Sequence, residues 1–135
     1  MAQEHEHGDS AGDAVVHDQN QLRTLVQAAI QDVERTDLLS PSLIAPLAHH
    51  LLARFHQEET ELFPRIERVA GDLLLSEIAS LRREHLVLRE FLSETEAALT
   101  RRDRAGARGN LLELATCLRL HCAREDGLYR KTPGQ

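Results

Sequence analysis

The chain has 135 residues, of which 41% are hydrophobic and 28% are charged, a balance typical of one soluble globular domain. The net charge of -6 argues against a nucleic-acid partner, because proteins that bind nucleic acids usually present a basic face. No apolar stretch approaches the roughly 20 residues that a membrane span needs. Cys117 and Cys122 lie too close together on one predicted helix to bridge each other. We therefore expect a reducing, cytoplasmic setting.

Helices are favoured over strands, because leucine is far more frequent in the chain than the β-branched residues valine and isoleucine together. Helical periodicity covers most of the sequence, and breaks are predicted at 37–42, at 71–72 and across 101–110. Ser40 followed by Pro41 is typical of a helix N-cap with proline in the first helical position. Short connections between helices of similar length imply antiparallel neighbours.

The fold class that follows is all-α, an antiparallel up-down-up-down four-helix bundle. We expect the bundle to occupy residues 14–130. Residues 1–13 are polar and are expected to form a flexible N-terminal tail, and residues 131–135 a short C-terminal tail.

Each predicted helix carries an apolar stripe, traced in steps of three and four residues, that turns polar at one level. Counted from the connections, these levels coincide, so the polar residues should share one cross-section of the bundle. The polar positions are Gln19, Arg54, Glu58, His85, His121 and Glu125. Ionised side chains buried without partners are costly, so we expect a metal ion or an ion-pair network to satisfy them.

The stripe of the second predicted helix contains two of these polar positions. The stripe runs through Leu47, Leu51, Arg54, Glu58, Leu62 and then Arg65 or Ile66. Pro64 lacks a backbone N–H, so it is expected to kink this helix just beyond the polar level.

His121 and Glu125 lie one helical turn apart, so their side chains face the same way. Such a pair is a weak signal alone, but Glu58 and His85 lie at the same level on facing stripes. Imidazole and carboxylate groups together suit iron, manganese or zinc. The sequence therefore predicts a metal site made by Glu58, His85, His121 and Glu125.

Three segments resemble the hemerythrin-like (HHE cation-binding) family. They are Arg54-Phe-His-Gln-Glu58-Glu59-Thr-Glu-Leu62-Phe63-Pro64, then Glu84-His85 with Leu88, and then His121-Cys-Ala-Arg-Glu125-Asp126 with Leu128-Tyr129. The resemblance implies an antiparallel four-helix bundle around a non-haem di-iron site whose irons are bridged by two carboxylates. Members of the family bind or sense oxygen, or handle peroxide or nitric oxide.

Under this resemblance, four residues match ligand positions of the family: Glu58, His85, His121 and Glu125. Two other ligand positions have lost their histidine. Arg54 stands four residues before the second-helix carboxylate, and Gln19 stands at the first-helix position. Both losses fall on the same iron. The resemblance thus implies a site reduced to one metal, with iron as the first choice and manganese or zinc as alternatives.

Arg54 is expected to replace the missing ion. Its guanidinium carries a permanent charge and offers only donors, so it cannot be a metal ligand. From its stripe position it should hydrogen-bond Glu58 or Glu125, with Gln19 nearby. The alternative is that its long side chain extends outward to solvent.

Three functions remain open at this stage. The first is a single-metal protein that handles oxygen, peroxide, nitric oxide or a small substrate, with or without catalysis. The second is a conventional di-iron oxygen-binding or sensing protein in which His17, His50 or His56 replaces the lost ligands, although His17 and His56 are expected to point away from the core. The third is a metal-free interaction bundle held by an Arg–Glu network. Charged outer faces permit a monomer.

Overall fold

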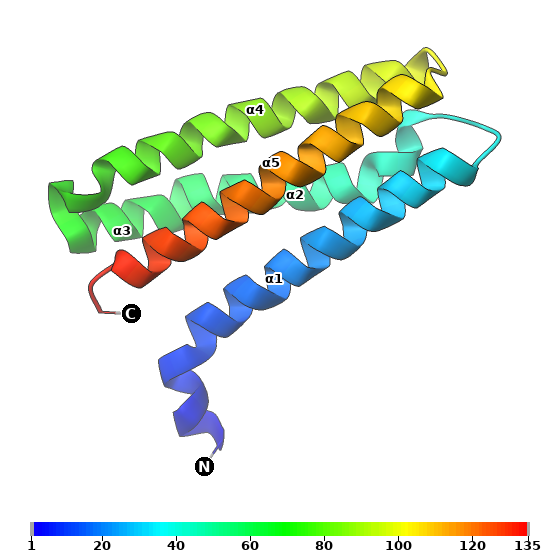
Figure 1. Ribbon diagram of the computed structural model, residues 1–135. Helices are drawn as coiled ribbons and strands as arrows, with labels where there is room; N and C mark the ends of the chain where they lie inside the picture. The colour runs from blue at the N-terminus through cyan, green and yellow to red at the C-terminus, as the bar shows by residue number, and fades with distance from the viewer. Residues whose placement is uncertain (1, 135) are drawn as a thin grey trace.

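The protein is seen here as a computed structural model, which describes the backbone of residues 2–134 and the side chains of residues 18–134. The described chain forms four antiparallel helical arms (Figure 1). The arms are α1 (Ala2–Arg35), then α2 (Ala45–Gln57), η2 (Glu58–Leu62) and α3 (Phe63–Ala70) in succession, then α4 (Leu75–Thr100), and α5 (Arg104–Lys131). The predicted all-α bundle is confirmed. The tail expected at 1–13 falls outside the described side chains, and that boundary stays a prediction.

The connections confirm two predicted breaks and correct the third. Short 3₁₀ helices, η1 (Pro41–Ile44) and η3 (Gly71–Leu74), overlap the first two breaks. The break predicted across 101–110 is much shorter, because α5 begins at Arg104. The carboxylate of Asp103 accepts a hydrogen bond from the Gly106 N–H at 2.9 Å, and this cap stabilises the first helical turn.

The second arm is not a uniform α-helix. Its middle segment, η2, is a π-helical turn in which the Phe63 N–H bonds to the carbonyl of Glu58, five residues back. This turn ends two residues before Pro64, where the sequence predicted a kink. The extra residue in the turn shifts the buried stripe, so that Phe63 is fully buried while Leu62 is only half-buried. The prediction that Leu62 continues the core stripe was therefore wrong by one residue.

The apolar core divides into two clusters on either side of the polar level. The larger cluster lies toward the connections at 36–40 and 101–103 and takes residues from every arm, among them Leu22, Val26, Leu47, Leu51, Phe55, Leu88, Leu92, Leu111, Leu114 and Leu118. The smaller cluster lies toward the 71–74 turn and contains Phe63, Ile66, Leu74, Ile78, Leu81 and Leu128. The polar residues thus occupy a layer between the two apolar clusters.

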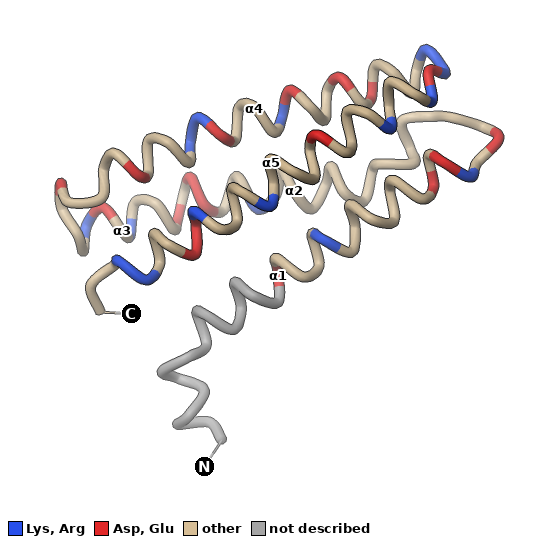
Figure 2. The backbone as a smooth tube through the Cα atoms, viewed as in Figure 1, with Lys and Arg blue, Asp and Glu red and all other residues tan. Residues whose placement is uncertain are grey.

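The outside of the bundle is mixed, because large apolar side chains such as Leu38, Leu73 and Leu86 are exposed among the charged ones. Acidic and basic residues are spread along the described parts of the arms (Figure 2). Among the described residues, every helix is too short or too polar to cross a bilayer. Cys117 and Cys122 are both free thiols, as expected.

Candidate metal centre

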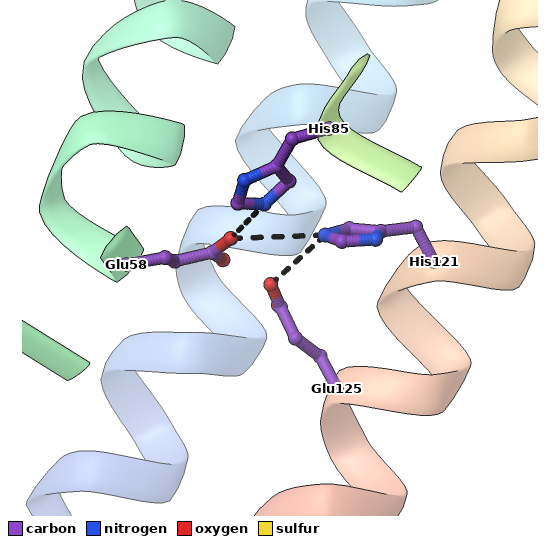
Figure 3. A group of neighbouring side chains, drawn as sticks. All are labelled: Glu58, His85, His121 and Glu125. Atoms are coloured by element: carbon purple, nitrogen blue, oxygen red, sulfur yellow. Dashed lines mark hydrogen bonds and ion pairs between the residues drawn. The ribbon is translucent and has the colours of Figure 1, made fainter. Parts of the chain in front are cut away.

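The structure brings the four predicted site residues together in the polar layer. Glu58 comes from the π-helical turn η2, His85 from α4, and His121 and Glu125 from successive turns of α5. All are buried, and each offers a possible ligand atom within 4.8 Å of the others. Figure 3 shows the side chains converging from three arms. The geometry therefore agrees with the set that the sequence pattern singled out.

Both imidazole rings direct Nε2 toward the centre of this group. His85 Nε2 lies 2.7 Å from Glu58 Oε1. His121 Nε2 lies 3.7 Å from the same oxygen and 3.2 Å from Glu125 Oε2. The Nε2 atoms of the two rings and the two carboxylates thus surround one small space.

Two buried atoms at this centre, His121 Nε2 and Glu125 Oε2, lie 3.2 Å apart and have no well-aligned hydrogen bond to any other group. Buried polar atoms are normally paired, because an unpaired group forfeits its hydration. Once the His121 ring has lost its proton, its Nε2 and the facing carboxylate oxygen both offer electron pairs, so a shared cation would satisfy both at once. The donor set present therefore fits a metal ion.

Arg54 lies inside the bundle, as predicted, with only 9% of its side chain exposed. Its Nε donates to Glu58 Oε2 at 3.0 Å, and its Nη2 donates to Glu125 Oε1. Each carboxylate therefore gives one oxygen to the guanidinium and turns its other oxygen toward the imidazole rings. The alternative in which Arg54 extends outward to solvent is wrong.

The third contact of Arg54 was not foreseen. Its Nη1 pairs with Asp18 on α1, and the other oxygen of Asp18 lies 2.9 Å from His50 Nε2. Gln19, which was expected beside Arg54, instead donates to the backbone carbonyl of Cys122 at 3.4 Å. The acidic residue next to the lost ligand position has taken the place that we assigned to Gln19.

The substitute ligands proposed for a second metal do not reach the site within the described side chains. His50 is engaged by Asp18, and His56 is exposed, as its position on the helix predicted. His49 is exposed as well. The side chain of His17 lies outside the described residues. The space between Asp18, Glu58 and Glu125 is occupied by the guanidinium of Arg54.

Two further carboxylates bind the outer nitrogens of the histidine rings. Glu84 Oε1 lies 2.8 Å from His121 Nδ1, and Glu59 contacts His85 Nδ1. Neither role was predicted from the sequence. The signal available was adjacency, because Glu59 follows Glu58 and Glu84 precedes His85.

Aromatic rings enclose the histidine pair. The ring of Phe55 stacks on His85 with centroids 4.0 Å apart and planes inclined by 19°, and Phe63 lies 5.8 Å from the same ring. Both phenylalanines are fully buried. They fix the plane of the His85 ring and keep water from that side of the centre.

The electrostatics of the layer follow from burial opposed by close charges. Burial would raise the pKa of Glu58, but hydrogen bonds with Glu125, His121 and His85 and the charge of Arg54 hold it well below its usual range. Burial and the neighbouring Glu58 raise the pKa of Glu125. Burial would lower the pKa of His121, but its two carboxylate neighbours raise it to about 10. Cationic and anionic groups in the layer therefore stabilise one another.

Cys122 follows a site residue but does not join the centre. The thiol is half-buried and packs against the larger core cluster. Burial raises its pKa to about 12, so it stays protonated near neutral pH and is a weak nucleophile and a weak ligand. The interpretation of Cys122 as a packing residue agrees with these observations.

Comparison with known protein families gives one match, which covers residues 4–131 and is described as the hemerythrin HHE cation binding domain. Because the match spans nearly the whole chain, the protein belongs to this family. No curated protein and no solved structure gave a significant match. The resemblance drawn from the sequence motifs is confirmed, and the helical arms form a hemerythrin-like bundle with a buried His/Glu cluster that could hold a metal.

Proposed function

We propose that this hemerythrin-family chain binds a single metal ion, iron foremost, through the buried cluster Glu58, His85, His121 and Glu125. One observation carries the proposal: each carboxylate has one oxygen on Arg54 and its other oxygen on the imidazole side. A bridging carboxylate in a two-metal site needs both oxygens for metals. Here one oxygen of each is already committed, which leaves ligands for one ion.

Arg54 takes the electrostatic role of the second ion. Its planar fork can donate to two carboxylates at once, which a lysine ammonium does less well. The guanidinium is nearly buried and makes contacts with Glu58, Glu125 and Asp18. It therefore keeps the carboxylates of Glu58 and Glu125 partly neutralised whether or not a metal ion is bound beside the histidines.

Two imidazole nitrogens and two carboxylate oxygens suit iron, manganese or zinc, and such a set leaves coordination positions open. A bound ion would supply redox or Lewis-acid chemistry toward a small molecule, for which oxygen, peroxide or nitric oxide are our candidates. The fully buried rings of Phe55 and Phe63 exclude water from one side of the cluster.

A pocket of about 340 Å³ lies between α1 and α5, next to the polar layer, and has Gln19 and Cys122 in its wall. That volume admits small molecules of this kind.

Metal analysis of protein purified without chelators tests the proposal. We expect about one equivalent of metal in the wild type, none in His121→Ala, and no change in the matched control His49→Ala, which removes an exposed histidine. Two equivalents would favour a conventional di-iron protein instead. No metal, even after exposure to Fe²⁺, Mn²⁺ and Zn²⁺ in turn, would favour a metal-free bundle held by the Arg54 network.

A further inference from the structure

We propose that Glu59 and Glu84 are positioning residues that orient the two histidines toward the metal; this inference rests on the proposed function. Both carboxylates lie outside the predicted ligand set, and each contacts the outer nitrogen of a different ring. The rings themselves are fully buried. The two contacts together form a supporting layer around the centre.

The contact from Glu84 links the surface to the centre across two helices. Its Oε1 lies 2.8 Å from His121 Nδ1, and its Oε2 accepts a hydrogen bond from Arg124. Glu84 is 21% exposed, whereas Arg124 is 57% exposed. An arginine at the surface therefore holds a carboxylate, which in turn holds the ring of His121.

The contact from Glu59 repeats this arrangement on the other ring. Glu59 Oε2 contacts His85 Nδ1, while the adjacent Glu58 reaches Nε2 of the same ring at 2.7 Å. Arg89 approaches Glu59 at 4.0 Å. The π-helical turn that begins at Glu58 widens the backbone here, and consecutive carboxylates thereby contact opposite sides of one imidazole.

These contacts decide which nitrogen is free to bind metal. When Nδ1 donates its hydrogen to a carboxylate, the ring is fixed in the tautomer whose Nε2 carries the lone pair. The carboxylate also makes Nε2 a stronger donor, and loss of such a partner typically weakens metal binding about 10- to 100-fold. In this protein both Nε2 atoms face the centre, so both rings have the orientation that the proposal requires.

The test compares Glu59→Gln and Glu84→Gln with the matched controls Glu90→Gln and Glu113→Gln, which change exposed glutamates on α4 and α5. Glutamine keeps the side-chain shape and removes the charge. Zn²⁺ affinity is measured by competition with a chromophoric chelator, and the thermal stability of the chelator-treated proteins is measured separately. We expect each site variant to bind Zn²⁺ about 10-fold or more weakly, and each control to bind as the wild type does.

A second measurement separates positioning from general stabilisation. In the Zn²⁺-loaded wild type, histidine ¹⁵N NMR should show Nδ1 protonated and slow to exchange in both rings, and Glu84→Ala should lose this protection for His121 only. Unchanged affinity and unchanged exchange in the site variants would overturn the positioning role while leaving the proposed function intact. A wild type that binds no metal would overturn both, and His121→Ala identifies that case because it would then match the wild type.

Discussion

Replacing Arg54 with leucine would leave two buried carboxylates without their permanent cation. The side chain of Arg54 is 9% exposed, and those of Glu58 and Glu125 are 5% and 2% exposed. Breaking a buried ion pair from one side typically costs about 3 to 5 kcal/mol. For a domain of this size, that loss corresponds to a fall in Tm of roughly 10 to 20 °C.

The assay is denaturant unfolding of chelator-treated Arg54→Leu beside the wild type, so that no metal compensates for the lost charge. Arg68→Leu, at an exposed position of the same arm, serves as the matched control and should change the free energy of unfolding by less than about 0.5 kcal/mol. The deficit of Arg54→Leu should also shrink as the pH falls, because protonation of Glu58 and Glu125 removes the stranded charge. A loss of unfolding free energy below about 1 kcal/mol at neutral pH would refute the idea that Arg54 neutralises the carboxylates, because removing one partner of a buried ion pair normally costs more than that.

Three further predictions address the same layer. Changing Arg54 and Gln19 together to histidine should restore both lost ligand positions and raise the iron content toward two equivalents by elemental analysis; a content that stays at one would contradict the assignment of the lost half-site. His121 has a pKa raised to about 10, so its stabilising contribution to the metal-free protein is complete below its ordinary pKa of 6.5 and is lost as the pH rises through about 10. Because metal must displace that proton, Zn²⁺ affinity should increase with pH over the same window by up to about tenfold per unit, and a flat profile would show that the proton is absent. Asp18→Asn should lower stability by only about 1 kcal/mol in thermal unfolding, because Asp18 is 30% exposed; a loss as large as that of Arg54→Leu would mean that Asp18 is the main partner.

The sequence alone was sufficient to predict the fold class and the central cluster, because both depend on residue spacing. Leucine stripes with helical periodicity determine which face of each arm is buried. A histidine and a glutamate one helical turn apart share a face, so His121 and Glu125 must both face the inward side chains of the neighbouring arms. The inward position of Arg54 followed from the same count.

The features that the sequence did not reveal depend on departures from regular geometry or on side-chain reach. The π-helical turn adds one residue to a repeat of three and four, so the count that located Glu58 placed Leu62 in the core stripe instead of Phe63. Asp18 and Glu84 lie beside the inward-facing stripe and not in it. Asp18 contacts Arg54 and Glu84 contacts His121 on a neighbouring arm, and these contacts depend on how far the side chains reach. Residue spacing does not record such contacts.

The π-helical turn also has an evolutionary consequence. Loops usually accept insertions and deletions, whereas helices that form a core do not. Here an arm of the bundle contains a residue beyond the regular repeat, and Phe63 and Ile66 fit the core because of it. Deletion of one residue from Glu58–Leu62 would turn the following helix by about 100° relative to the preceding one and carry both side chains toward solvent. We therefore expect the length of this segment to be under stronger selection than the identity of its exposed residues, such as Thr60.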